Sequence, residues 1–172
     1  MKRSLLFLAL LSVLLSPFAV SALDPAALTS EEITMIERNC REAQRNLQRI
    51  QYVDPVTRVS RGNATANVIK LMSALNARAS ANTYNIPALV TATNNVQRIR
   101  QDFTDDYTSY EIGLREVVLM DCQANPVSFY RKLTEVRSKR AILSTHAKSI
   151  ELELDSFSQH ISDLANLVKD AR

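Results

Sequence analysis

The sequence has very little glycine and no tryptophan: only two glycines occur in 172 residues. A fold built on tight β-hairpins needs glycine where the backbone takes positive φ, so this composition argues against a β-rich protein. Alanine, leucine and arginine are abundant instead, and these residues favour the α-helix. We therefore expect an all-α protein.

Motifs of the common catalytic and cofactor sites are also missing. The chain has no glycine-rich phosphate loop, no CxxC, no HExxH and no GxSxG. Its two histidines, His146 and His160, lie about 21 Å apart along a helix, too far to share one metal ion. We expect a protein that is not an enzyme, with no catalytic residues, no cofactor and no metal site.

Charge of the two signs is nearly balanced. Lysine and arginine number 21 and aspartate and glutamate 18, but Lys2 and Arg3 lie in the N-terminal segment, which leaves 19 against 18. A chain with so little net charge has no general attraction for a polyanion. We expect no nucleic-acid partner.

The longest apolar run lies at the N-terminus. Leu5 to Leu15 follows two basic residues, and Val20-Ser21-Ala22 offers small side chains for cleavage, which is typical of a signal peptide at residues 1–22. The alternative is an uncleaved anchor, because this apolar stretch is nearly long enough to span a bilayer. We expect residues 23–172 to form a single helical-bundle domain. It would have no stable membrane span and an extracytoplasmic location, in a periplasm or at a cell surface.

Cysteine is scarce but even in number. Cys40 and Cys122 are the only two. In an exported chain a pair of cysteines favours a disulfide. The alternative is two free thiols buried as small apolar side chains.

Apolar residues at spacings of three and four predict four helical segments. The first begins at a capping box, Thr29 to Glu32, and the second covers about 63–84. The third covers about 87–122. The fourth begins after Asn125-Pro126 and continues for about 44 residues, or roughly 65 Å. Helices of this length predict an elongated antiparallel bundle or coiled-coil hairpin.

Residues 52–62 are predicted to break the first helix. Pro55 removes a backbone donor and clashes with the preceding turn, and it biases Asp54 toward extended backbone. The neighbouring valines and threonine also favour extended structure, and Gly62 permits a turn.

Two topologies follow from such a break. In the first, the two segments are roughly collinear along the third helix, and the break takes up length so that Cys40 reaches Cys122. In the second, the first helix folds back into a four-helix bundle and both cysteines stay free. We favour the collinear arrangement.

The antiparallel pairing of the last two helices places two seam charges at one level. Asp106 and Arg140 are the only charges among their seam positions. A paired charge in a seam costs far less than a lone one, so we predict a salt bridge between them that fixes the register.

Residues 52–62 also include four apolar side chains that are unusual for a loop, and we propose them as a candidate interaction surface: Tyr52, Val53, Val56 and Val59. The alternative is that they pack onto the third helix near Tyr107 and Tyr110.

The first helix carries four arginines away from its apolar seam: Arg38, Arg41, Arg45 and Arg49. They form either a solvated outer face or a basic stripe for an acidic partner.

These features together favour an exported, non-catalytic helical protein that binds another protein, or itself, in the structure of a cell envelope or surface. The alternative function is an extracytoplasmic holdase-type chaperone or a carrier of an apolar ligand.

Overall fold

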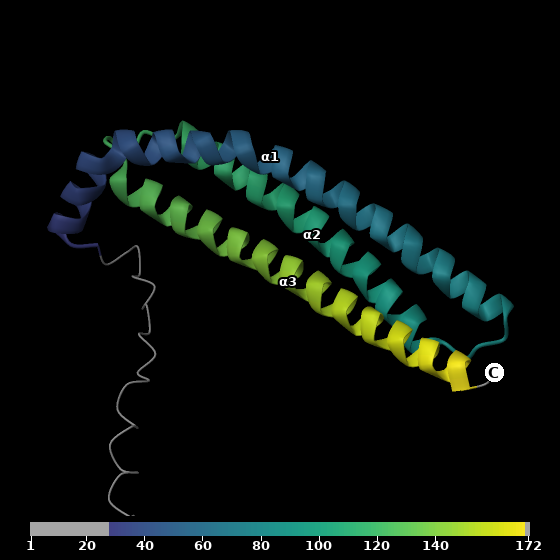
Figure 1. The fold of residues 1–172 in the computed structure, drawn as a ribbon. Coiled ribbons are helices and arrows are strands. Elements are labelled where there is room, and N and C mark those ends of the chain that lie inside the picture. Colours follow the sequence, from purple (N-terminus) through teal and green to yellow (C-terminus); the bar gives the residue numbers. More distant parts are fainter. Residues whose placement is uncertain (1–27, 171–172) are drawn as a thin grey trace, which may run out of the picture.

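The computed structural model describes residues 28–170, which form three long helices (Figure 1). Helix α1 spans Ser30–Ala81, α2 spans Pro87–Leu119 and α3 spans Pro126–Asp170. No β-strand occurs in this part of the chain. The prediction of an elongated all-α helical bundle is therefore confirmed. The predicted signal peptide at residues 1–22 lies outside the described residues.

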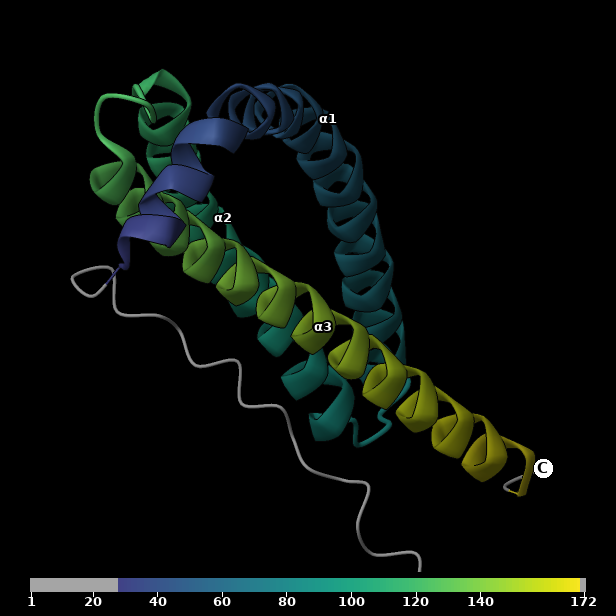
Figure 2. The same ribbon diagram turned by 90° about the vertical axis from the view of Figure 1, so that its left-hand side faces the viewer.

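Helices α2 and α3 form an antiparallel hairpin. A short turn at 120–125 joins them, and Asp121 closes it by accepting hydrogen bonds from the backbone N–H groups of Gln123 and Ala124 at 2.9 and 3.0 Å. The two helices lie side by side along the length of α2 in Figures 1 and 2. Gly113 lets them approach closely, because a Cβ at this position would lie 3.1 Å from Val136 Cγ2.

Helix α1 begins at the predicted capping box. The Thr29 backbone N–H donates to the Glu32 carboxylate at 2.7 Å, and the Glu32 N–H donates to Thr29 Oγ1 at 3.3 Å. The hydrogen bond from the Thr29 backbone lowers the pKa of Glu32. Two of the donors that every helix N-terminus leaves without intrahelical partners are satisfied in this way.

The prediction of a break at 52–62 is wrong. Helix α1 continues through this segment for 52 residues, with Pro55 inside it. A proline in a helix interior costs about 3 kcal/mol, and the helix either kinks or breaks at that point. Here both ends of α1 are fixed to the hairpin, so the chain bends instead of breaking. The two predicted segments are collinear, as parts of one helix.

Helix α1 is bowed: its middle stands away from the hairpin and its two ends come close to it (Figure 2). Two contacts explain the bow, the Cys40–Cys122 disulfide and a hydrogen bond of 2.9 Å from Asn76 to Thr93. Between these contacts α1 covers 36 residues, from 40 to 76, whereas the opposing chain covers only 29, from 93 to 122. Seven extra residues add up to about 10 Å of helix, and the bow takes up this length.

Two separate apolar clusters hold the molecule together. The first surrounds the disulfide and buries α1 residues Cys40 and Leu47 against both helices of the hairpin. The second lies at the other end of α1, where Ile69, Met72 and Ala79 pack against the start of α2 and against Phe157 of α3. Between Leu47 and Ile69, α1 has no buried residue.

Candidate interaction surface

The middle of α1 has its amphipathic character reversed. The inward positions carry apolar residues up to Ile50, and the same spacing then continues with Asp54 and Arg58. Apolar side chains occur instead on the outward side, at Tyr52 and Val56 among others. A surface helix normally turns its apolar stripe to the core. Helix α1 does so at both ends and does the opposite between them.

Asp54 fastens the middle of α1 to the hairpin. The Tyr110 hydroxyl donates to Asp54 Oδ2 at 2.6 Å, and Arg140 Nη2 lies 3.4 Å from Asp54 Oδ1. Tyr110 is only 1% exposed, and desolvation by burial together with the Asp54 hydrogen bond raises the pKa of its hydroxyl. Tyr110 therefore stays protonated and acts as a donor to the carboxylate throughout the physiological pH range.

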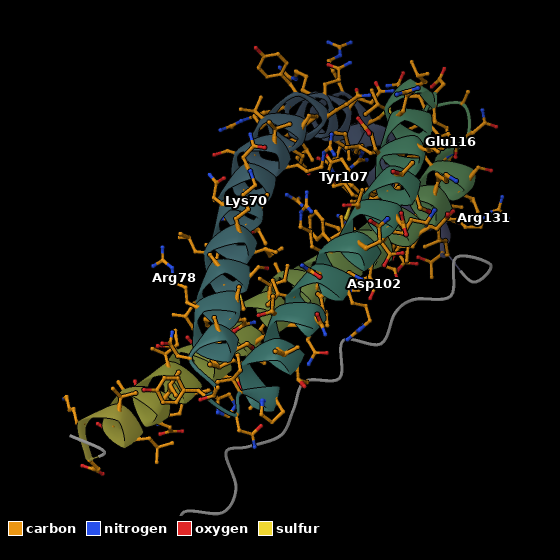
Figure 3. All side chains as sticks on the ribbon, turned by 90° about the vertical axis from the view of Figure 1, so that its right-hand side faces the viewer. Lys70, Arg78, Asp102, Tyr107, Glu116 and Arg131 are labelled. Carbon is orange, nitrogen blue, oxygen red and sulfur yellow. A yellow bond between two sulfur atoms is a disulfide. The ribbon has the colours of Figure 1, made fainter. Side chains whose placement is uncertain are left out.

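Arg58 makes the second contact under the bow. Its guanidinium carbon lies 4.6 Å above the ring centroid of Tyr107, a cation–π geometry. Figure 3 shows Tyr107 on the side of α2 that faces α1. Burial raises the pKa of the Tyr107 hydroxyl. Arg58 Nε is buried and has no hydrogen-bond partner among residues 28–170.

The predicted salt bridge between Asp106 and Arg140 is wrong. Arg140 pairs with Asp54, and Asp106 contacts His146, whose Nε2 lies 2.8 Å from Asp106 Oδ2. The prediction treated α2 and α3 as an isolated pair. In the three-helix arrangement α1 brings Asp54 to Arg140, while Asp106 finds a partner within the hairpin.

The four apolar residues of the predicted interaction surface point to solvent. Their side chains are exposed to a large extent: Tyr52 80%, Val53 46%, Val56 66% and Val59 53%. The alternative, in which they pack near Tyr107 and Tyr110, is wrong: Asp54 binds the Tyr110 hydroxyl and Arg58 lies over the Tyr107 ring, while the four apolar side chains are exposed. On a helix of 3.6 residues per turn, positions 52, 56 and 59 share one face, and position 53 lies at its edge.

The same outward face continues toward the N-terminus of α1 as the basic stripe. Its four arginines are exposed and follow one another at spacings of three and four: Arg38, Arg41, Arg45 and Arg49. No carboxylate of the described residues forms a salt bridge with any of them. We call the continuous surface made by these arginines together with Tyr52, Val56 and Val59 the outer stripe.

A groove of about 450 Å³ opens on another side of α1, between its N-terminal half and the hairpin. Leu47, Ile50 and Leu133 give it apolar walls, but five of its twelve lining residues are polar or charged: Asn39, Glu42, Asn46, Arg137 and Arg140. It is a mixed surface and not an enclosed apolar cavity.

Within the described part of the chain, no group of three or more His, Cys, Asp or Glu side chains could hold a metal ion. Helices α1 to α3 also include no segment that is long and apolar enough to span a membrane. Comparison with known proteins gives no further guidance, since no family model, curated protein or solved structure matches this chain.

Sequence reasoning found the four exposed apolar residues but missed the polar contacts beneath them. A signal for these contacts was present. The inward spacing of α1 continues past Ile50 to Asp54 and Arg58, which is what an unbroken helix would produce. Pro55 obscures this signal, because a proline inside a helical pattern ordinarily indicates a kink or a break.

Proposed function

We propose that this is an exported, non-catalytic protein that binds another protein of a cell envelope or surface through the outward face of the middle of α1. The observation that carries the proposal is the exposed apolar patch of Tyr52, Val56 and Val59. Exposed apolar side chains that adjoin one another mark interaction sites, whereas scattered ones are ordinary. The three side chains of this patch adjoin one another because they share one helix face.

The contacts beneath the patch support the proposal. Asp54 and Arg58 occupy the inward side, so the apolar side chains cannot turn inward without removing a charged group from its partners. The patch is therefore held on the outside by the structure of the helix itself. A rigid, preformed surface loses little conformational entropy when it binds.

The disulfide supports an extracytoplasmic location. Cys40 and Cys122 are joined, with their α-carbons 5.5 Å apart. Disulfides form and persist in oxidising compartments and are rare where thiols are kept reduced. This agrees with the signal peptide that the N-terminal sequence predicts.

The test is chemical crosslinking in intact cells that produce the protein, followed by purification and mass spectrometry. We expect one dominant protein partner with the unaltered chain, and loss of that partner when Tyr52, Val56 and Val59 are all changed to serine. A matched control changes three exposed apolar residues elsewhere, Ile112, Leu119 and Leu167, to serine. Equal recovery of the partner by both variants, or no partner at all, would contradict the proposal.

The alternative function, a chaperone or carrier of an apolar ligand, predicts a different result. The groove beside α1 is a candidate compartment for such a ligand, although nearly half of its lining is polar or charged. Native mass spectrometry of the purified protein distinguishes the two functions. A bound apolar molecule that disappears when Leu47 and Leu133 are changed to serine would favour the carrier.

A further inference from the structure

We propose that the partner presents an acidic helix, which lies along the outer stripe with its carboxylates opposite the arginines and its apolar residues opposite Tyr52, Val56 and Val59. This inference rests on the proposed function and specifies the chemistry of the partner. It is carried by the continuity of charged and apolar positions on one face of α1.

The stripe is continuous from Arg38 to Val59. Successive members are separated by 3, 4, 4, 3, 4 and 3 residues: Arg38, Arg41, Arg45, Arg49, Tyr52, Val56 and Val59. This is the spacing of one helix face, and all seven side chains are exposed. The stripe spans 22 residues, and its first and last α-carbons are about 32 Å apart along the helix. It therefore presents six turns of surface, basic in the first half and apolar in the second.

In the portion of the chain that the structure describes, the arginines of the stripe form no salt bridge with the carboxylates that lie near them in sequence. Glu37 and Glu42 are the nearest carboxylates in sequence, but Glu37 is half-buried and Glu42 lines the groove on another side of α1. Neither forms a salt bridge with the stripe in the structure of residues 28–170. Arginines with free guanidinium groups can bind carboxylates with two parallel hydrogen bonds each.

The spacing of the arginines matches that of a helical partner. Arg41, Arg45 and Arg49 are four residues apart, so their α-carbons repeat about every 6 Å. Carboxylates at positions i, i+4 and i+8 of a second helix have the same repeat. Such a helix would continue with apolar residues at the same spacing where it meets Tyr52 and Val56.

The outer stripe fits a second copy of the chain poorly. Among the described residues, exposed carboxylates outside any salt bridge include Asp105 of α2 and Glu151 and Asp155 of α3. None of these three belongs to a run of three carboxylates four residues apart, because the positions on either side of Glu151 and Asp155 at this spacing are Ala147 and Gln159. A different protein can supply the third carboxylate that α2 and α3 lack.

A membrane surface also fits poorly. A helix that lies in a bilayer interface separates its apolar residues from its basic ones around the helix axis, so that only the apolar side enters the lipid. In the outer stripe the arginines and the apolar residues share one side of the helix. Insertion of the apolar residues into a bilayer would therefore also move the charged Arg49 toward its hydrocarbon interior. We therefore assign the stripe to a protein partner.

The test uses photo-crosslinking side chains placed one at a time at positions 45 and 56 of the full chain, in cells that produce the protein. We expect one protein to be captured from both positions. The peptide attached at position 45 should carry acidic residues at a spacing of three or four, and the peptide attached at position 56 should be apolar. Capture from position 56 alone, or a neutral or basic peptide at position 45, overturns the inference but leaves the proposed function standing. Capture of lipid or of a second copy at position 45 also overturns it.

Binding measurements with the captured protein complete the test. Changing Arg41, Arg45 and Arg49 to glutamine should weaken binding about tenfold at low ionic strength and flatten its dependence on salt. The matched control changes Arg100, Arg115 and Arg131, which are exposed and lie off the stripe, and should change the affinity less than twofold. Figure 3 shows Arg131 on α3, remote from the bow of α1. Equal effects of the two triple variants would attribute the result to net charge and overturn the inference.

Discussion

The two ends of α1 and its middle are attached to the hairpin by different kinds of contact. Each end buries apolar side chains, and the disulfide strengthens the first of these clusters. The middle rests on Asp54, Arg58 and two tyrosines. Apolar packing supplies most of the stability of a folded chain, whereas a hydrogen bond exchanged with water contributes little. The ends therefore fix the fold, and the middle is free to turn its apolar side chains outward.

The largest expected effect comes from removing the disulfide at one end. With Cys40 and Cys122 both changed to alanine, we expect the free energy of unfolding to fall by up to about 4 kcal/mol, because the bridge closes a loop of 82 residues in the unfolded chain. Amide hydrogen exchange should rise along residues 30–62 of α1 before it rises in the hairpin. Unchanged hydrogen exchange in α1 of this double variant would show that the disulfide does not anchor this end of the helix.

The apolar cluster at the other end should respond almost as strongly. Met72 is 2% exposed, and its change to alanine leaves a cavity, so we expect a loss of about 2 to 4 kcal/mol in urea unfolding. The adjacent Leu71 is 71% exposed and serves as the matched control, with an expected change within about 0.5 kcal/mol. Similar losses for the two variants would contradict the packing described for this end.

Polar contacts in the middle should matter less. Changing Asp54 to alanine leaves the buried Tyr110 hydroxyl without its acceptor, at an expected cost of about 1 to 3 kcal/mol. Adding Tyr110→Phe removes the unsatisfied donor and should recover part of that loss. A double-mutant cycle from chemical unfolding measures the coupling, which we expect to be about 1 kcal/mol. Purely additive losses would mean that the hydrogen bond contributes nothing.

The same tyrosine predicts a pH dependence. The pKa of Tyr110 is raised in the folded protein, so the folded chain keeps this proton where the unfolded chain loses it. The stability that protonated Tyr110 gives the folded protein is fully present below the ordinary tyrosine pKa of 10.0. It is lost as the pH rises above that value, by at most about 1.4 kcal/mol per pH unit. Unfolding measured between pH 9 and 11 should show a shallower decline for Tyr110→Phe. Parallel curves for the two proteins would exclude this linkage.

The smallest effect is expected at the start of α1. Thr29→Ala removes the side-chain half of the capping box and should cost about 1 kcal/mol, seen as faster hydrogen exchange in the first turn. Thr29→Ser keeps a hydroxyl at this position and should leave exchange nearly unchanged. If both variants exchange alike and fast, the cap contributes nothing to this end.

Local patterns predicted much of this structure. Capping residues, turn residues and apolar spacing indicated where α1 begins, where α2 begins and how long α3 is, because these features depend on neighbours within one or two turns. The pairing of Cys40 with Cys122 was predicted from their even number and from a break that would bring them level; the disulfide is present, but the bow of α1 takes up the length instead of a break. The exposed apolar residues at 52–59 were also visible in the sequence as side chains without an evident core.

Two features were decided only by the tertiary structure. The continuity of α1 through Pro55 depends on contacts at residues 40 and 76, which together hold the helix in line against the local cost of the proline. The partner of Arg140 depends on where the bow of α1 places Asp54, which no pattern within α2 and α3 can reveal. Local sequence thus determined the helices, and the fixed distance between two anchoring clusters decided how α1 bends and which face it turns to solvent.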